Sequence, residues 1–179
     1  AAAMVLSIGA YAASGIIASW SGSSNSWPDY KELPTTAECM KDIGYEPVFK
    51  DKFENGYVFK DGRIVNNSLM DENDNAVEKF KSISFDYVKG DDTVIYSAMK
   101  YDSEMDNTAD VIAEKNGTEF YYSKYTNKAV PADYTMTEED KRAEESGELV
   151  FSYGANEVSI SEVQGLSWYY DGIHYSFTQ

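Results

Sequence analysis

The first charged residue of this chain is Asp29, and no Lys, Arg, Asp, Glu or His precedes it. All of the 15 basic and 31 acidic side chains therefore lie in the rest of the 179-residue chain. The first 20 residues are almost wholly apolar or small. As a helix they would extend about 30 Å, which is the thickness of the hydrocarbon core of a bilayer. This break in composition divides the chain into an apolar leader and an acidic remainder.

We predict that residues 1–20 form a transmembrane helix, with Trp20 at the depth of the membrane interface. Two alternatives remain open for this segment. A secretory signal peptide would explain the small residues of Ala13–Ala18, but its apolar run is normally shorter and it begins with positive charge. A buried helix of a soluble protein would need apolar surroundings on every side, which a chain with a mean hydropathy of -0.50 hardly supplies.

The segment after the leader predicts the orientation of the chain in the membrane. Residues 21–34 include the Ser/Gly/Asn run Ser21–Ser26, which is typical of a flexible linker, and contain no cluster of Lys or Arg. Cytoplasmic flanks usually carry such a cluster. We therefore expect a single-pass protein of the cell membrane with residues 21–179 outside the cytoplasm. Because the sequence begins with neither Met nor a charged flank, we also expect further residues before Ala1.

Residues 35–179 have the length of one ordinary domain with a core of its own. The net charge of -16 and the pI near 4.3 argue against nucleic acid as a partner, because like charges repel. With one cysteine, Cys39, the chain cannot form an intramolecular disulfide. No phosphate-binding loop or dinucleotide fingerprint is present, and we expect no cofactor.

Two short helices are predicted from their capping residues. Thr35 and Glu38 match a capping box, and Gly44 supplies the C-terminal stop of a helix near Thr36–Ile43. Thr137 precedes three acidic residues, an order that suits the dipole at the start of a second helix, which would stop at Gly147.

The rest of the domain is predicted as β-hairpins. In the segment 77–88, Ile83, Phe85 and Tyr87 alternate with polar residues, as in a half-buried strand, and Phe80 breaks that phase. From Phe80 we expect either a bulge or a second packed face. Hairpin turns are expected at the positions Lys60-Asp61-Gly62, Met70–Asn75, Gly90–Asp92, Asn116-Gly117 and Asp171-Gly172. The predicted class is α+β, a mainly antiparallel sheet of consecutive hairpins with two short helices, preceded by the transmembrane helix.

No catalytic constellation is evident in the sequence. His174 is the only histidine, and we expect it on a strand, facing solvent, opposite the apolar set. Cys39 lies in an acidic setting that does not favour a thiolate, and one Cys with one His does not make a zinc site. Asp71, Asn73 and Asn75 have the first spacings of a calcium loop, but the pattern then fails, and an ordinary polar turn explains them more simply.

Three stretches of the sequence resemble a known group of proteins: TTAECMKDIGYEP, FENGYVFKDGRI and VQGLSWYYDGIHYSF. The last contains Trp168-x-x-Asp171-Gly172-Ile173-x-Tyr175. These stretches resemble the extracytoplasmic domains of single-pass, anti-sigma-factor-like membrane proteins of Gram-positive bacteria, many of unknown function. The resemblance implies a cytoplasmic segment, preceding the membrane span, that holds a sigma factor. It implies no catalytic residues.

We therefore expect a non-enzymatic sensor or binding domain, anchored through residues 1–20, for a ligand or protein of the cell envelope. The candidate contact surface consists of aromatic residues at one end of the sheet: Tyr121, Tyr122, Tyr125, Trp168, Tyr169 and Tyr170. An alternative is a lipid or peptide carrier with a curved sheet, which would need an apolar cavity between helix 36–43 and the sheet. A third hypothesis, a carbohydrate hydrolase, would need two carboxylates about 5–9 Å apart in a cleft.

Overall fold

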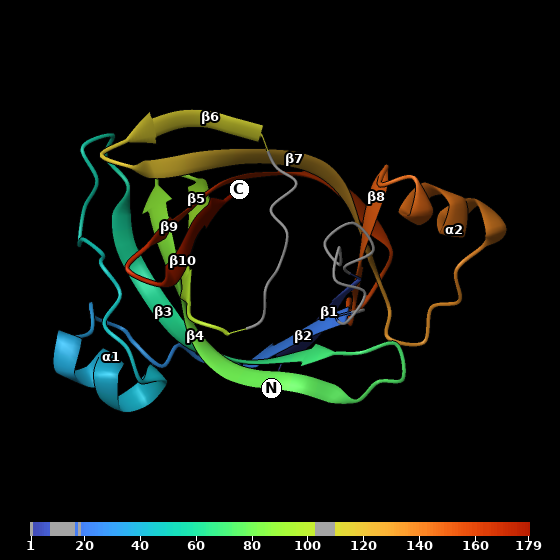
Figure 1. Ribbon diagram of the computed structural model, residues 1–179, viewed down its shortest axis with the longest axis horizontal. Helices are drawn as coiled ribbons and strands as arrows, with labels where there is room; N and C mark the ends of the chain where they lie inside the picture. The colour runs from blue at the N-terminus through green and yellow to red at the C-terminus, as the bar shows by residue number, and fades with distance from the viewer. Residues whose placement is uncertain (1, 8–16, 18, 103–109) are drawn as a thin grey trace.

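The structure is a computed structural model that describes residues 2–7, 17, 19–102 and 110–179 (Figure 1). The helices of the described part are α1 (Thr36–Ile43) and α2 (Glu138–Glu145). Its strands are β1 (Ala2–Ser7), β2 (Ser19–Ser24), β3 (Val58–Met70), β4 (Ala76–Lys89), β5 (Asp92–Met99), β6 (Asp110–Lys115), β7 (Thr118–Val130), β8 (Leu149–Tyr153), β9 (Ser159–Tyr170) and β10 (Ile173–Thr178).

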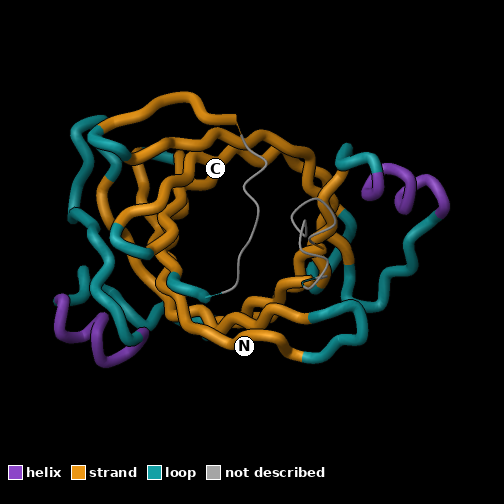
Figure 2. The backbone as a smooth tube through the Cα atoms, viewed as in Figure 1, coloured by secondary structure: helices purple, strands orange, loops and turns teal. Residues whose placement is uncertain are grey.

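The strands form one sheet that curls until its ends meet. Nine of them follow one another as β7-β8-β1-β2-β3-β4-β5-β10-β9, and β9 pairs again with β7, which closes a ring. Strand β6 pairs with β7 as an additional strand. Figures 1 and 2 show the ring with both helices outside it. Every pairing is antiparallel except β7 with β8, two parallel strands that are connected through α2.

The α+β class with a mainly antiparallel sheet is confirmed, and so are both helices. Thr35 caps α1 in a capping box with Glu38, and Gly44 ends the helix with a φ of 87°. Thr137 caps α2 in the same manner, since its hydroxyl accepts the N–H of Asp140 while the Asp140 carboxylate accepts the N–H of Thr137. Local capping chemistry therefore placed both helices correctly.

The predicted transmembrane helix over residues 1–20 is not shown by the described residues of that segment. Strand β1 pairs antiparallel with β2, from Ala2 opposite Ser24 to Ser7 opposite Ser19. Residues 1, 8–16 and 18 lie outside the described residues. In the part of the chain that is described, no helix is long and apolar enough to cross a bilayer.

The first residues of the segment 21–34, predicted as a linker, belong to β2, which pairs with β3 from Ser24 opposite Val65 to Ser19 opposite Met70. Strands β1 and β3 flank these Ser and Gly residues and supply partners for their backbone groups. Only the later part of the segment 21–34 forms the connection to α1.

Asp61-Gly62 is not a hairpin turn, although that pair was predicted as one. Strand β3 runs through it, with a register shift between Phe59 and Asp61 that marks a bulge. Gly62 lies directly opposite Phe85, and a Cβ added at Gly62 would lie 2.5 Å from Cδ1 of that ring. The glycine is therefore needed for close packing rather than for a turn.

The other predicted turns are confirmed. Chain reversals follow Met70, Lys89, Lys115 and Tyr170, and left-handed φ values occur at Asn116 (55°) and at Asp171 (52°). Residues 159–170 form the single strand β9.

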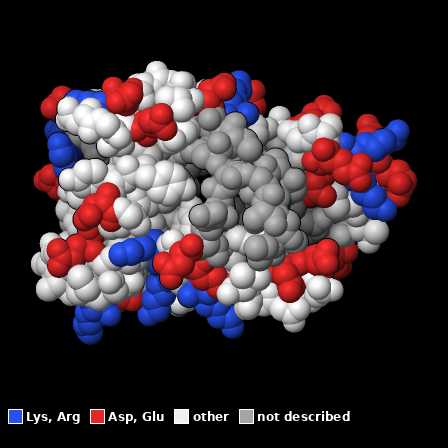
Figure 3. All heavy atoms as spheres, in the orientation of Figure 1, with Lys and Arg blue, Asp and Glu red and all other residues white. Residues whose placement is uncertain are grey.

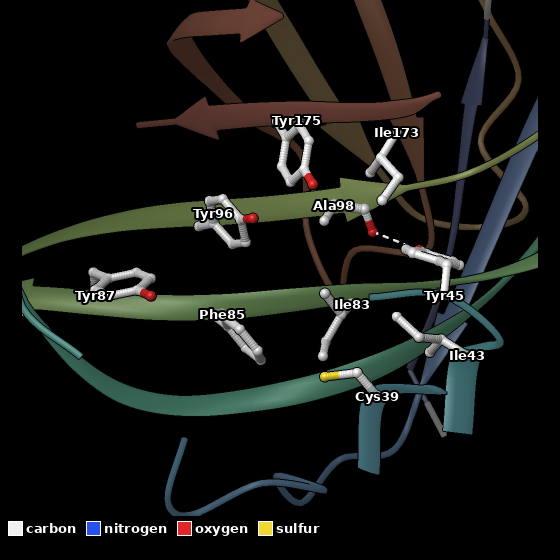
Figure 4. Packing of buried hydrophobic residues seen from close by; sticks show 10 residues of the cluster. All are labelled: Cys39, Ile43, Tyr45, Ile83, Phe85, Tyr87, Tyr96, Ala98, Ile173 and Tyr175. Atoms are coloured by element: carbon white, nitrogen blue, oxygen red, sulfur yellow. Dashed lines mark hydrogen bonds between the residues drawn. The ribbon is translucent and has the colours of Figure 1, made fainter. Parts of the chain in front are cut away.

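The main core lies on the outer face of the ring, beneath α1 and residues 45–57, which we call the covering segment (Figure 4). Its side chains come from three neighbouring strands and from the cover. The fully buried members include Cys39, Ile83, Phe85, Tyr87, Ala98 and Tyr175. Alternation along β4 directs Ile83, Phe85 and Tyr87 to this face, as the sequence predicted.

Buried tyrosines hold the covering segment on the sheet through their hydroxyl groups. Tyr45 donates to the carbonyl oxygen of Ala98 at 2.8 Å. Tyr96 donates to the carbonyl of Val48 at 2.6 Å, and Tyr87 donates to the carbonyl of Lys50 at 2.6 Å. Backbone groups of a segment without regular structure are thereby satisfied. This arrangement gives the high tyrosine content of the chain a structural role.

The inner face of the same strands is largely polar. Residues that lie directly opposite one another share a face, and one row of such residues crosses six strands: Arg63, Ser84, Ser97, Ser176, Ser167 and Tyr121. Phe80 belongs to this inner face, where it packs with Trp20 and Leu69. Of the two alternatives expected for Phe80, a bulge or a second packed face, the structure therefore shows the second packed face.

Candidate functional site

A groove lined mainly by aromatic and aliphatic side chains opens on the outer face, between the covering segment and strands β5, β9 and β10. We call it the aromatic groove. Its volume is about 320 Å³, and it is lined by Phe53, Asn55, Tyr57, Tyr87, Val94, Leu166 and Phe177. This is near the lower end of the volumes of small-molecule sites in proteins, roughly 300–1,000 Å³.

A shallower depression of about 180 Å³ continues the aromatic groove toward the end of β10. The two hollows share Val94, Leu166 and Phe177 as walls. The depression adds Tyr122, Gln164 and Gln179 to the lining. Together they form a strip of accessible apolar surface with amide side chains along its border.

The C-terminal hairpin builds one wall of the groove. The turn at Asp171-Gly172 sets the register of β9 and β10, which places Phe177 directly opposite Leu166. Phe53 forms the other wall, with its ring centroid 5.3 Å from that of Phe177 and 4.6 Å from that of Tyr87. A tight turn holds Phe53 in place, because the N–H of Gly56 donates to its carbonyl at 3.0 Å.

The chemistry of the lining suits binding of an uncharged group. Among the residues that the structure describes, no Asp, Glu, Lys, Arg or His lines either hollow. Burial raises the pKa of Tyr87 to about 12, so its hydroxyl stays protonated at neutral pH and remains bonded to the covering segment. Asn55 and Gln164 can exchange hydrogen bonds with a ligand at the border. The groove is therefore equipped to hold an apolar or aromatic group.

The structure does not bring the six predicted aromatic contact residues onto one surface, and three of them face outward. Tyr122 lines the shallow depression and its hydroxyl donates to Gln164 Oε1 at 3.0 Å. Trp168 stacks on Tyr175, with ring centroids 5.4 Å apart, as part of the core. Tyr170, next to the hairpin turn, is 56 % exposed.

The other three predicted contact residues share the inner face. Tyr121 and Tyr125 lie opposite Ser167 and Val163 on this face, and the Tyr121 hydroxyl donates to Glu119 at 2.5 Å. Tyr169 contacts Tyr101 through the two hydroxyl groups, whose oxygens are 3.0 Å apart. Adjacent residues of a strand point to opposite faces, so a run of neighbouring tyrosines cannot form one patch.

His174 was expected to face solvent, and that expectation is wrong. Its ring lies on the inner face against Tyr169 and Tyr101, with centroid distances of 4.7 Å and 6.4 Å. The Nδ1 atom is buried and has no hydrogen-bond partner among the described residues. Burial lowers the pKa of His174 to about 4, so the imidazole is neutral at physiological pH.

This shift of the His174 pKa predicts a pH dependence of stability. The unfolded chain, with a pKa of 6.5, binds the proton more readily than the folded chain, with a pKa of about 4. The free energy of unfolding should therefore fall as the pH drops from about 6.5 to about 4, by up to about 3 kcal/mol. Urea denaturation of the protein and of His174→Gln over this range measures the effect. If the protein and His174→Gln lose stability equally over this range, the conclusion that His174 is buried and neutral is contradicted.

The other titratable candidates have structural surroundings. Burial, followed by the charges of Asp42 and Glu38, raises the pKa of the Cys39 thiol to about 11, which agrees with the expectation of an unreactive thiol. Asp71 Oδ1 accepts the backbone N–H groups of Asn73 and Asn75, an arrangement that closes a turn. In the described part of the chain, no cluster of His, Cys, Asp or Glu has the geometry of a metal site.

One pair of neighbouring carboxylates, Asp61 and Asp86, lies on the inner face. Asp61 and Asp86 lie opposite each other, and Nη1 of Arg63 is 3.0 Å from Asp61 Oδ1 and 3.4 Å from Asp86 Oδ2. Both carboxylates thus share one cation. A general acid that faces a separate base, which the hydrolase hypothesis needs, is not formed by this pair.

A larger hollow of about 850 Å³ separates α2 from strands β7, β8 and β9. Two of the charged residues that line it are paired with each other: Lys128 Nζ lies 2.6 Å from Asp140 Oδ1 and 3.1 Å from the Tyr134 hydroxyl. That hydroxyl also donates to Asp140 Oδ2 at 2.7 Å. These contacts hold α2 against the sheet, so we regard this hollow as structural.

Sequence reasoning missed most of the groove. The neighbours of Phe177 across the groove, such as Phe53 and Tyr57, are remote from it in sequence. Phe53 and Tyr57 lie in the covering segment, which has no periodicity from which a position could be inferred. Their aromatic character in a segment otherwise rich in charged residues was the only available signal.

Comparison with protein-family models, with curated proteins and with solved structures finds no match to this chain.

Proposed function

We propose that this protein is a non-enzymatic sensor or binding domain that acts outside the cytoplasm and takes an apolar or aromatic group of its ligand into the aromatic groove. The observation that supports this proposal is the groove itself, an accessible strip with apolar walls and amide groups at its border. Pockets with this balance of apolar walls and few polar groups are the usual sites of ligand binding.

Attachment to the cell membrane through residues 1–20, and a role as the outer part of an anti-sigma-factor-like regulator, belong to the same proposal. The support comes from the absence of charge before Asp29 and from the resemblance of the C-terminal hairpin. In such a regulator, ligand binding would change the conformation or association of the domain, and a cytoplasmic partner such as a sigma factor would respond. Extraction of cell membranes with alkaline carbonate tests the attachment, because a spanning protein stays in the pellet.

The carrier alternative gains no support from the structure. It needed an apolar cavity between helix 36–43 and the sheet, but Cys39 and Ile43 pack there directly against strand residues such as Ile83. The accessible apolar surface lies farther along the covering segment instead. A groove of about 320 Å³ fits one ring or a short aliphatic group better than a whole lipid.

Binding of N-phenyl-1-naphthylamine, an uncharged aromatic fluorophore, tests the groove. We expect saturable binding that Val94→Trp weakens at least tenfold, because the indole fills the space between Phe53 and Leu166. A tenfold change corresponds to about 1.4 kcal/mol of binding free energy.

Ile95→Trp is the matched control for this experiment. Ile95 adjoins Val94 on β5 and points to the opposite face of the sheet, where it lies opposite Asp86. The same bulky side chain at this position should leave binding unchanged. Equal binding by both variants and the unaltered protein would contradict the proposed site.

A further inference from the structure

Strand β9 has an unpaired edge along its first half. Its pairing with β10 extends from Tyr170 to Gly165, whereas its pairing with β7 continues to Ser159. On the β10 side, residues 159–163 therefore have no strand partner among the described residues. Residues 159–162 are exposed, and Ile160 is 64 % exposed.

The hydrogen-bond pattern shows which backbone groups this edge presents. Gln164 and Gln179 exchange both backbone hydrogen bonds, each at 3.0 Å. In an antiparallel ladder such pairs recur at every second residue. The N–H and C=O groups of Glu162 and Ile160 therefore point away from β7, toward the open edge.

The edge lacks a bulge, a proline and a lysine, which are features that commonly prevent the addition of another strand. The register of β9 with β7 continues without a bulge from Trp168 to Ser159. By contrast β6, which also has a free edge, carries a register shift between Val111 and Ala113. Bulges, prolines and lysines are the common protections of exposed edges, and residues 159–163 contain none of them.

The surroundings of the edge are acidic. From Ala143 to Gln179 the chain contains no Lys or Arg, whereas it contains six acidic residues. Glu162 lies on the edge itself, where its Oε1 is 2.7 Å from Nζ of Lys124 on β7. Ile160 borders the hollow beside α2, which is lined by Glu139, Asp140 and Glu148 and by Lys128 and Arg142. Figure 3 shows acidic side chains predominating around α2. A partner with positive charge is therefore favoured.

We propose that this edge of β9 binds an extended basic peptide, which adds antiparallel to β9 as a further strand. The peptide would exchange backbone hydrogen bonds with Glu162 and Ile160. Residues opposite these two positions share their face, so a Lys or Arg that shares the Glu162 carboxylate with Lys124 and an aliphatic residue opposite Ile160 give the best fit. This surface goes beyond the aromatic groove, although the Gln164–Gln179 pair at the start of the edge also borders the shallow depression.

The test is a fluorescence-anisotropy titration of the protein with a labelled peptide of sequence Val-Lys-Thr-Val-Lys, in which the first Lys is placed opposite Glu162. Ile160→Pro removes one edge donor and no hydrogen bond to β7, because its N–H points away from β7. We expect at least tenfold weaker binding by Ile160→Pro and unchanged binding by Ile160→Val. Circular dichroism confirms that both variants are folded.

The peptide supplies an independent control. Methylation of the backbone nitrogen of the first Lys should abolish binding, whereas methylation of the Thr nitrogen, which points away from β9, should not. The peptide Val-Glu-Thr-Val-Glu should bind at least tenfold more weakly, and high salt should weaken binding of the basic form. If Ile160→Pro or the methylated first Lys has no effect, the proposal is overturned.

Two further measurements separate this proposal from its alternatives. Val94→Trp should leave peptide binding unchanged. A defect in ligand binding to the aromatic groove is thereby distinguished from a defect in peptide binding to the edge of β9. Sedimentation measures self-association, and a dimer that Ile160→Pro dissociates would show that the edge pairs with a second copy of the chain, which would also overturn the proposal.

Discussion

Replacement of Phe85 by Ala is expected to lower the free energy of unfolding by about 3–5 kcal/mol, the largest effect of any single substitution considered. Phe85 is fully buried at the centre of the outer core. Its ring makes edge contacts with Phe49 and Phe59, both at 5.2 Å between centroids, and stacks with Tyr96 at 5.8 Å.

The cavity left by this substitution cannot collapse easily. Tyr96 is held by its hydrogen bond to Val48, and Tyr30, another neighbour of the ring, is held by a 2.8 Å hydrogen bond to Asp42. Urea denaturation followed by tryptophan fluorescence measures the loss. Phe80→Ala, a truncation of a partly buried ring on the inner face, is the control and should cost less. Equal losses would contradict the placement of the main core on the outer face.

Gly62→Ala is expected to lower the free energy of unfolding by about 1–3 kcal/mol, although it adds only one methyl group. The new Cβ would lie 2.5 Å from Cδ1 and 2.7 Å from Cε1 of Phe85, well inside contact distance. The Phe85 ring cannot move away, because Phe49, Phe59 and Tyr96 surround it. The backbone at Gly62 is not left-handed, so steric overlap is the expected cause.

A double variant separates steric overlap with Phe85 from the other effects of Gly62→Ala. Phe85→Leu shortens the opposing side chain and leaves room for the added methyl group. In Gly62→Ala/Phe85→Leu the loss should therefore be clearly smaller than the sum of the two single losses, measured by the same denaturation experiment. Additive losses would show that Gly62 is not required by the packing of Phe85.

The sequence predicted the parts of the fold that depend on local chemistry. The capping boxes at Thr35 and Thr137 and the turn at Asp171-Gly172 were placed correctly because the groups that satisfy one another lie within a few residues. Asp61-Gly62 has the same local signature as a turn, yet a remote residue, Phe85, determines its conformation. Local signals cannot distinguish these two uses of glycine.

Ring closure and the groove depend on contacts between remote segments. Pairing of β9 with β7 and of β1 with β8 joins strands separated by helices or long connections, and alternation within each strand does not specify the neighbour. Phe53 meets Phe177 across most of the chain length. The sequence predicts Tyr169 and Tyr170 as parts of one contact surface, but alternation along β9 directs them to opposite faces of the sheet.

The most direct test of the account is to map where an aromatic ligand binds. Methyl groups of Val, Leu and Ile can be labelled and followed by NMR during a titration with N-phenyl-1-naphthylamine. We predict saturable shifts of the methyl signals of Val94 and Leu166, which line the aromatic groove, with no shift for Val65 or Leu69 on the inner face. Saturable shifts confined to Val65 and Leu69, or no saturable shift at all, would contradict the aromatic groove as the ligand site.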